Sequence, residues 1–335
     1  MRTAIIGAGG IAQPHAKAID ELGVKIVGVL DPNVQNANAM AQRYGSKVIT
    51  TLDEVMDDID MIHLLTPPSK RVEYVRQAAK AGKHIFIEKP ITVSIEEGKE
   101  VVRLATENNV KLLVGFNHRY RDGYRMLKEA LDSGILGEVV SVYAHRLGAG
   151  AGFNNVWSPS WRTQKDLVCG MSIESVSHDI DMLLQLVDGV ESISAHVNGT
   201  IKELPTFDNN AAVSFTTKGG GIGSIHASWS SHLGHSERGI IGTKGSCVIA
   251  GDDLWDFDNF IIRTVDMPYP QITKVGELFA TTAYDSYLNT NRHFIECIEK
   301  DLEPLTSGED GLRTLIFSHA ILESSKTGKA VVVDL

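Results

Sequence analysis

A glycine-rich turn near the start of the chain constrains the fold most strongly. Residues 3–7 form a short apolar run that predicts a buried strand, and Gly7-Ala8-Gly9-Gly10-Ile11-Ala12 follows with the pattern GxGxxA. In this pattern the first glycine permits a tight turn, the second lets the backbone approach a pyrophosphate, and the small last residue lets helix and strand pack closely. A helix predicted over residues 11–22 would direct the N–H groups of its first turn at the anion. The turn therefore predicts a dinucleotide site.

An acidic residue beyond the turn supports this prediction and favours one cofactor. Asp31 ends the next predicted strand, residues 25–31, at about the twenty-residue distance at which a carboxylate accepts the ribose hydroxyls. The carboxylate would repel the 2′-phosphate of NADP, and no Arg or Lys follows it directly. We therefore expect NAD, with NADP the less favoured alternative. The residues expected to bind it here are Gly7, Gly9, Gly10, Ile11, Asp31 and Pro32.

The first part of the chain alternates between apolar runs and amphipathic segments. Further strands are expected near residue 48 and at 61–66, 84–90 and 111–116, with helices at 34–44, 72–81 and 95–108. Apolar runs of this kind are typical of a parallel sheet covered on both faces, and the βαβ order predicts an α/β, doubly wound Rossmann sheet. Ligands of such sheets bind at the carboxyl ends of the strands. This places Thr66, Pro67, Glu88 and Lys89 at the cofactor site of a domain spanning residues 1–118.

From about residue 119 the pattern changes to a series of strands between helices. A helix at 124–133 leads to a strand with the sequence VVSVYAHRL, residues 139–147. Further strands are expected at 192–199, 211–217, 223–230, 237–243 and 246–250, with short strands near 255–265. Helices at about 282–300 and 310–327 close the chain. This predicts a substrate-binding and oligomerisation α+β domain over residues 119–335 with a large, mostly antiparallel open sheet. One face of the sheet should pack on helices. We expect a second subunit to cover the other face, in a homodimer or homotetramer.

Composition narrows the classes of function. The 335 residues carry a formal net charge of −10, and no Lys/Arg block is present, so a nucleic-acid partner is not expected. No apolar run reaches the roughly 18 residues of a membrane span, and the N-terminus lacks the features of a signal peptide. We therefore expect a cytoplasmic protein without a membrane partner. Cys169, Cys247 and Cys297 are far apart, which favours free thiols over a disulfide framework or a metal site.

Glu88-Lys89-Pro90 closes a predicted strand beside the cofactor site. Pro90 forces Lys89 into an extended conformation and is compatible with a cis peptide bond. A lysine that is fixed and partly desolvated in this way can exchange protons near neutral pH. The alternative interpretation is an ordinary surface lysine at a strand end.

A second candidate group lies on a helix predicted over residues 172–187. Glu174, His178 and Asp181 have the spacing i, i+4, i+7 and so share one face, opposite an apolar face. Hydride transfer from an alcohol needs a base for the hydroxyl proton, and His is the usual choice. Two other interpretations stay open, a solvated polar face and a metal site. No second His or Cys motif supports the metal site, so no metal is expected.

Together these motifs resemble the Gfo/Idh/MocA oxidoreductases, which include glucose–fructose oxidoreductase and inositol dehydrogenase. The resemblance covers nearly the whole chain and rests on GAGGIA, Asp31, TPP, GKHIFIEKP, VGFNHRY and ESVSHDID. AGKHxxxEKP is its most specific piece, and VGFNHRYRDGY and SHDIDMLLQL look closest to the inositol dehydrogenase branch. The resemblance implies that Lys89 hydrogen-bonds the reacting hydroxyl within a proton relay, that His178 is the general base and that Glu174 orients the substrate.

The resemblance implies further positions around the two ligands. Asn117 and the pair Trp161-Arg162 would lie near the nicotinamide. His118, His145 and Tyr284 would line the substrate pocket.

Three departures from the family pattern bear on these roles. Glu174 stands where the inositol enzymes carry Asp, which alters the ring or hydroxyl accepted. TPPSKR replaces TPNxxH, so Arg71 stands where the family has His, and the resemblance implies that Arg71 approaches the cofactor. Cys169-Gly170-Met171 replaces a GGG-like motif before the catalytic helix.

These observations predict an NAD-dependent dehydrogenase that oxidises a secondary hydroxyl of an inositol-like or aldose-like polyol or sugar, with Lys89 and His178 in the proton relay. Four arginines near the expected pocket leave an acidic sugar open as the substrate: Arg119, Arg121, Arg146 and Arg162. Two alternatives share the fold, an NAD-using glycosidase and a non-enzymatic NAD-binding sensor. Retention of Lys89 and His178 argues against the sensor.

Overall fold

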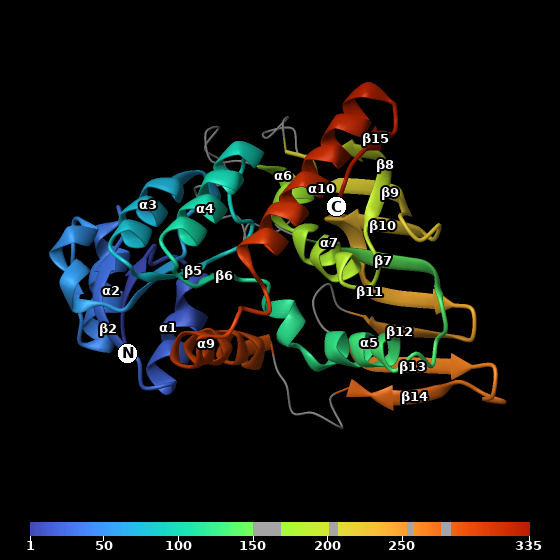
Figure 1. Cartoon of the computed structure of the whole chain (residues 1–335), viewed down its shortest axis with the longest axis horizontal. Helices are drawn as coiled ribbons and strands as arrows, with labels where there is room; N and C mark the ends of the chain where they lie inside the picture. The colour runs from blue at the N-terminus through green and yellow to red at the C-terminus, as the bar shows by residue number, and fades with distance from the viewer. Residues whose placement is uncertain (150–168, 201–206, 253–256, 276–282) are drawn as a thin grey trace. The chain divides into compact units, whose positions relative to one another are not determined.

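The chain folds into two compact units, each built from two segments of the sequence. The computed structural model describes residues 1–149, 169–200, 207–252, 257–275 and 283–335 (Figure 1). One unit comprises Met1–Tyr120 and Tyr284–Leu315, and the other comprises Arg121–Ala283 and Ile316–Leu335. The expected linear boundary after residue 118 differs from this division in one respect. Residues 284–315 group with the N-terminal unit because their helix joins its core, in which Phe294 is fully buried.

The first unit is a six-stranded parallel sheet in the order β3-β2-β1-β4-β5-β6. Its strands are β1 (Arg2–Ile6), β2 (Lys25–Leu30), β3 (Lys47–Val48), β4 (Met61–Leu64), β5 (His84–Ile87) and β6 (Leu112–Val114). The order reverses between β1 and β4, which is the switch point of a doubly wound sheet. The predicted Rossmann fold is therefore confirmed, with each strand within a few residues of its expected position.

Helices cover both faces of this sheet. They are α1 (Ala12–Glu21), α2 (Val34–Tyr44), α3 (Val72–Lys80), α4 (Ile95–Glu107) and α9 (Ala283–Lys300), with short 3-10 turns η1 (Leu52–Glu54), η2 (Met56–Asp58), η3 (Pro68–Lys70) and η4 (Asn117–Tyr120). Figure 1 shows α3 and α4 on one face and α1 and α9 on the other. Local signals set the helix ends, since the side chains of Asn33 and Ser94 cap α2 and α4.

The second unit is built on a nine-stranded sheet in the order β14-β13-β12-β11-β7-β10-β9-β8-β15. Its strands are β7 (Val139–Ala149), β8 (Val190–Asn198), β9 (Asn210–Thr217), β10 (Ile222–Ser228), β11 (Ser230–Gly242), β12 (Gly245–Gly251), β13 (Asn259–Thr264), β14 (Gln271–Lys274) and β15 (Val331–Val332). The strand pairs are antiparallel except β10 with β7, which run parallel. The predicted, mostly antiparallel sheet is confirmed.

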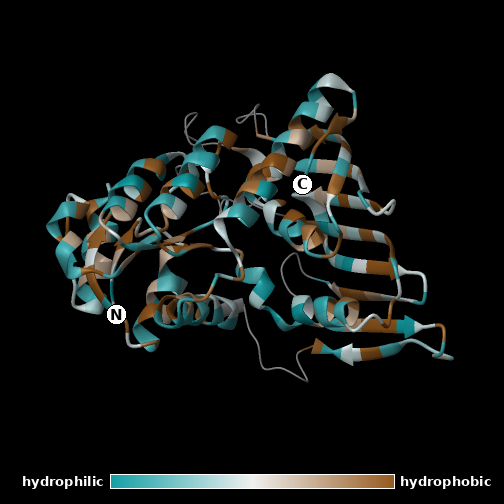
Figure 2. Ribbon diagram, viewed as in Figure 1, coloured by the Kyte–Doolittle hydropathy of each residue, from teal (hydrophilic) through white to brown (hydrophobic). Residues whose placement is uncertain are grey.

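Helices pack on one face of this sheet, and buried residues therefore alternate with more exposed ones along its strands. The helices are α5 (Asp122–Asp132), α6 (Gly170–Glu174), α7 (Ser177–Leu184) and α10 (Gly308–Thr327), of which the last joins this unit from Ile316 onward. Hydrophobic and polar residues alternate along β9 and β10, as Figure 2 shows by colour. The inward residues form one core with Leu127 of α5, Leu183 of α7 and Phe317 of α10. Among the described residues, no helix has the length and hydrophobicity that crossing a membrane requires.

Candidate cofactor and catalytic site

The glycine-rich turn has the geometry that a pyrophosphate site needs. Gly7 adopts φ +96°, and a Cβ on it would lie 2.8 Å from the backbone carbonyl of Leu65, so only glycine fits there. A Cβ on Gly9 or Gly10 would meet no atom within 4 Å, which leaves open space over the turn. No side chain caps α1, and its first turn carries no acidic residue. This helix end therefore suits an anionic ligand.

Asp31 lies against this turn, as the cofactor prediction requires. Its Oδ2 accepts the N–H of Ala8 at 2.6 Å, and its Oδ1 accepts the N–H of Asn33 at 2.7 Å. Each carboxylate oxygen accepts more than one hydrogen bond, so both keep capacity for ribose hydroxyls. Thr66 supplies a second sign of a ligand, because its buried Oγ1 has no hydrogen-bond partner among the described residues. The residues at this edge of the sheet fit NAD.

Lys89 lies at the same edge, directly after β5. The Lys89–Pro90 peptide bond is cis, which is one of the two forms that the sequence allowed. The Lys89 side chain is half-buried, and its N–H donates to Oε2 of Glu88 at 3.0 Å. Oε1 of Glu88 accepts from Nε2 of His15 at 3.0 Å. Burial alone would raise the pKa of Glu88, but the hydrogen bond from His15 and the charges of Lys89 and Arg71 lower it.

A chain of buried hydrogen bonds continues from this glutamate into the core. Nδ1 of His15 lies 3.0 Å from Nδ2 of Asn291, and Oδ1 of Asn291 lies 2.9 Å from Nε2 of His63. Nδ1 of His63 lies 2.9 Å from Oγ1 of Thr3. Nδ2 of Asn291 also donates to the carbonyl of Tyr287, which fixes the amide orientation and makes Nε2 of His63 the donor. Sequence reasoning missed this chain, because its members come from α1, α9, β4 and β1 and follow no period.

Because His63 is buried, we expect the free energy of unfolding to depend on pH. Burial, together with the nearby His15, lowers the pKa of His63 from 6.5 to about 3. Because its pKa is lower in the folded state, its contribution to stability is complete above pH 6.5 and is lost as the pH falls toward 3. The loss approaches about 1.4 kcal/mol per pH unit within that window. We expect urea unfolding at several pH values to show a shallower acid dependence for His63→Gln than for wild type.

The exposed His196 provides the matched control for this prediction. His196→Gln makes the same replacement at an exposed position on β8, so the acid dependence of this variant should equal that of wild type. Equal slopes for His63→Gln and wild type between pH 6.5 and 4 would contradict the assignment.

Arg71, for which the resemblance implies a cofactor contact, binds the backbone of its own unit in the structure. Arg71 is only 2% exposed. Its Nε and Nη2 donate to the carbonyl of Thr66 at 3.1 and 2.7 Å, and its Nη1 donates to the carbonyls of Glu88 and Pro90. The guanidinium thus binds backbone at the ends of two neighbouring strands.

Two further predicted residues follow β6. Asn117 and His118 lie in η4 and are buried, and Nδ2 of Asn117 donates to Oγ of Ser286 at 2.9 Å. Arg119 pairs with Asp310 at 3.2 Å and donates to the carbonyl of Leu305. An arginine with these partners has a structural use, which weakens the case for an acidic substrate.

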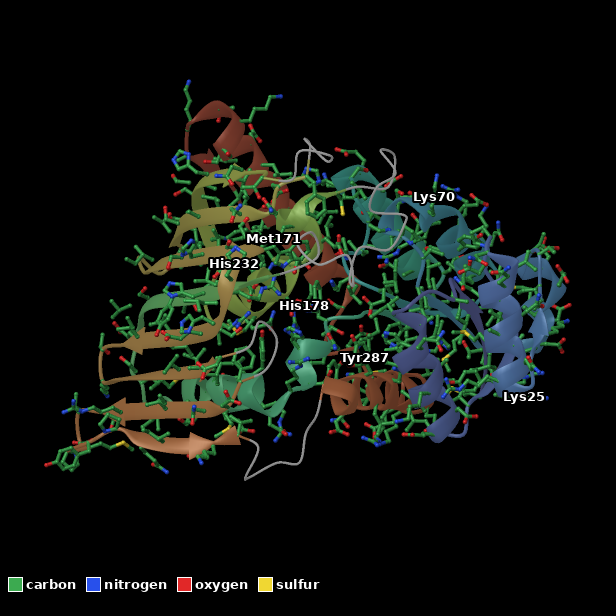
Figure 3. The ribbon with its side chains drawn as sticks, turned by 180° about the vertical axis from the view of Figure 1, so that it is seen from behind. Lys25, Lys70, Met171, His178, His232 and Tyr287 are labelled. Atoms are coloured by element: carbon green, nitrogen blue, oxygen red, sulfur yellow. The ribbon has the colours of Figure 1, made fainter. Side chains whose placement is uncertain are left out.

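The second predicted group, Glu174, His178 and Asp181, lies on two short helices rather than one. Glu174 ends α6, and His178 and Asp181 lie on α7 beyond a break at Ser175 and Val176. Figure 3 labels His178 on α7 and Met171 on α6. All three predicted residues are buried, so they are not a solvated face. Within the part of the chain that the structure describes, no cluster of three or more His, Cys, Asp or Glu side chains is arranged to hold a metal.

A buried ion triad beside His178 was missed from the sequence. Oδ1 of Asp179 accepts from Nε and Nη2 of Arg238 at 2.9 and 2.5 Å, and Oδ2 lies 3.0 Å from Nε of Arg146. Nη2 of Arg146 also donates to Oγ of Ser175. The triad ties the start of α7 to β7 and β11. A signal was present, because Arg146 and Arg238 occupy inward positions of their strands, where an arginine needs a buried partner.

The structure does not bring His145 together with His178. Arg146 points to the helix-covered face of the sheet, so His145, one residue earlier, points to the opposite face. Its neighbours there are Tyr143, with rings 5.4 Å apart, and His226 and Glu237 on the adjacent strands. Burial lowers the pKa of His145. The pocket role implied for it has no support within this unit.

Three residues of the predicted site are not described. Trp161 and Arg162 lie outside the described residues. Tyr284 belongs to α9, but its side chain lies outside them as well.

Comparisons with known proteins agree with the geometry of the turn. Residues 1–116 match the family described as "Oxidoreductase family, NAD-binding Rossmann fold", and residues 124–248 match the "GFO/IDH/MocA C-terminal domain". The chain is 28% identical to inositol 2-dehydrogenase of Rhizobium meliloti (strain 1021), over 97% of this chain and 96% of that protein. It is also 28% identical to the NAD(+)-dependent scyllo-inositol 2-dehydrogenase of Bacillus subtilis (strain 168), over 100% and 97%.

Solved structures add to this comparison. A putative myo-inositol dehydrogenase from Sinorhizobium meliloti 1021 superposes with a TM-score of 0.81 at 27% identity, covering 99% of each chain. Levoglucosan dehydrogenase in complex with NADH superposes with a TM-score of 0.88 at 22% identity, also covering 99% of each chain. At that identity the second match bears on the fold alone.

Proposed function

Because the chain belongs to the Gfo/Idh/MocA family of NAD-binding oxidoreductases, we propose that it is a dehydrogenase that oxidises a secondary hydroxyl of an inositol or a sugar. The observation that carries the proposal is the position of Lys89. It stands half-buried at the carboxyl end of β5, on the sheet edge where the glycine-rich turn and Asp31 lie. NAD, when bound, supplies the acceptor for a hydride.

The residues of this chain then have separate tasks. Lys89 donates a hydrogen bond from Nζ to the reacting hydroxyl, fixes its orientation and takes part with His178 in the relay of the hydroxyl proton. His178 takes the hydroxyl proton on its imidazole as the general base. Glu174 accepts hydrogen bonds from a further hydroxyl of the substrate, and a second residue with that task is His118.

We favour a neutral substrate over an acidic one. Arg119 and Arg146 were candidates for binding a carboxylate, but they are paired with Asp310 and Asp179. The named relatives act on inositols, and a relative from Ensifer adhaerens that is 25% identical over 99% of this chain is 1,5-anhydro-D-fructose reductase. A neutral polyhydroxy ring is common to these names.

A substrate panel tests the proposal. Inositols, aldoses and sugar acids are each supplied with NAD, and NADH is followed by absorbance. We expect turnover with at least one neutral inositol or sugar. Hydrolysis of glycosides without accumulation of NADH from any free sugar would favour the NAD-using glycosidase instead.

Asp31 is expected to set the choice between NAD and NADP. Its carboxylate repels a 2′-phosphate, so the wild type should bind NADH more tightly than NADPH. We expect Asp31→Ser to shift the ratio of the two dissociation constants toward NADPH by about tenfold or more, the equivalent of roughly 1.4 kcal/mol. The measurement is a titration of NADH and NADPH followed by fluorescence.

A matched control for this titration is Asp57→Ser, which changes an exposed carboxylate on η2. The ratio of the NADH and NADPH dissociation constants of this variant should equal that of wild type. Equal affinity of the wild type for both cofactors would contradict the role given to Asp31.

We also propose that a second copy of the chain covers the outer face of the nine-stranded sheet. Ile222 and Ile241 are 59% and 42% exposed, and both lie beside Ser141 in the register of that face. Analytical ultracentrifugation of the wild type tests this proposal, with Ile222→Asp as the variant expected to dissociate. A wild-type monomer at micromolar concentration would contradict it.

A further inference from the structure

The guanidinium of Arg71 binds the backbone on both sides of Lys89. Its Nη1 donates to the carbonyl of Glu88, which precedes Lys89, and to the carbonyl of Pro90, which follows it. Its Nε and Nη2 donate to the carbonyl of Thr66, beyond β4. One buried side chain therefore connects the ends of β4 and β5 and holds the turn that carries Lys89.

The opposite side of the same turn is held by Glu88. Its carboxylate accepts the N–H of Lys89 and the Nε2–H of His15. Gly115 packs so closely against this carboxylate that an added Cβ would lie 2.8 Å from Oε1. His15 is held in turn by Asn291. The backbone of Lys89 thus has its neighbouring carbonyls bound by Arg71 and its N–H bound by Glu88, which leaves its side chain as the part that can reach a ligand.

The donors of Arg71 explain why arginine suits this place. A guanidinium presents five N–H donors in a fixed plane, whereas an imidazole has two ring nitrogens. The five donors of a guanidinium suffice for the three carbonyls on these two strand ends, whereas the two ring nitrogens of an imidazole do not. The same use of the donors argues against a main role in binding the phosphates of the cofactor.

We propose that Arg71 is a positioning residue that fixes Lys89 for catalysis by binding the carbonyls of Glu88, Pro90 and Thr66. The inference rests on the proposed function, in which Lys89 contacts the reacting hydroxyl. It replaces the cofactor contact that the sequence implied for Arg71.

A double-mutant cycle tests whether Arg71 acts through Lys89. The cycle uses the panel substrate with the highest turnover and compares wild type, Arg71→Ala, Lys89→Ala and the double variant. We expect Arg71→Ala to lower kcat by about a hundredfold, the order of loss that a misplacement of 1 Å produces. In the Lys89→Ala background the same change should lower kcat by less than about threefold, because the group that it positions is gone. The dissociation constant of NADH should stay within about threefold in all four proteins.

The outcomes separate this inference from the proposed function. Lys89→Ala with nearly wild-type turnover would overturn the proposed role of Lys89 and the inference with it. A large effect of Lys89→Ala with fully additive losses in the double variant would overturn only the inference. Weaker binding of NADH with unchanged kcat in Arg71→Ala would likewise overturn it, and would show a cofactor contact.

Hydrogen–deuterium exchange provides a readout that needs no substrate. We expect Arg71→Ala to accelerate exchange in peptides that cover residues 87–92. The control is Arg76→Ala, on helix α3 directly after Arg71 but 37% exposed at its side chain, and it should leave those peptides unchanged. If Arg71→Ala does not fold, Arg71→Lys keeps the charge but not the planar set of donors and should show the same local acceleration. Unchanged exchange over residues 87–92 in the folded variant would overturn the inference.

Discussion

Replacing Lys89 by alanine is expected to lower kcat by a factor of about 10² to 10⁴, the range in which a positioned proton-transfer group contributes. The reason is structural as well as chemical. The backbone around Lys89 is held by hydrogen bonds from Arg71 and to Glu88, so the alanine variant should keep the turn and lose only the amino group. The measurement is the steady-state rate of NADH formation with the best panel substrate.

The loss should fall on turnover and not on cofactor binding. We expect the dissociation constant of NADH to stay within about threefold of the wild-type value, because the glycine-rich turn and Asp31 remain. Lys89→Arg keeps the positive charge but cannot give up a proton, and should also be strongly impaired. Lys25→Ala is the matched control, since Lys25 is an exposed lysine at the amino end of β2, the end of the sheet away from the ligand edge. Turnover of Lys89→Ala within a few-fold of wild type would refute the role.

The first unit could be predicted from the sequence because its signals are local. A buried parallel strand appears as an apolar run, and the turn at Gly7 needs glycine for a steric reason that holds wherever the motif occurs. Asp31 could be placed because its distance from the turn follows from one βαβ unit.

The features that were missed depend on pairings between distant residues. The hydrogen-bond chain behind Glu88 joins His15 to Asn291, 276 positions apart, and nothing in either segment indicates the other. The sequence of α9 likewise does not indicate that this helix belongs to the first unit. The helix does so because its Phe294 packs into the core of that unit. The motif gives the position of Arg71 in the sequence but not the direction of its side chain, which the structure turns toward backbone carbonyls.

The alternation of side chains along β7 indicates the faces of the sheet on which His145 and Arg146 lie. Two adjacent residues of a strand point to opposite faces, so His145 and Arg146 cannot both face one pocket. The inward neighbours Ala144 and Val142 identify Arg146 as the buried residue and His145 as the one on the outer face. The alternation of a strand therefore predicts that His145 does not lie on the sheet face that α7 covers. It also predicts that Arg146 needs a buried partner.

Replacing that partner, Asp179, should have the largest effect on stability. Asp179, Arg146 and Arg238 are 0%, 1% and 0% exposed. Burial lowers the pKa of Arg146, while Asp179 offsets the burial of Arg238 and raises its pKa. Without the carboxylate, two guanidinium groups would remain buried side by side. Removing one partner of a buried ion pair costs about 3–5 kcal/mol, so we expect a loss of that order in the free energy of unfolding of Asp179→Ala, measured by urea denaturation.

Two further proteins make this prediction specific to the buried charge. The control Asp132→Ala removes an exposed carboxylate that pairs with Lys128 on α5, and should change the free energy of unfolding by less than about 1 kcal/mol. The triple variant Arg146→Met, Asp179→Leu, Arg238→Leu removes all the charges together. Apolar replacement of a whole buried ion group is often neutral or stabilising, so this variant should recover most of the stability that Asp179→Ala loses. A loss for Asp179→Ala no larger than that of Asp132→Ala would show that solvent or a rearranged side chain compensates the arginines, and that the triad does not hold α7 to the sheet.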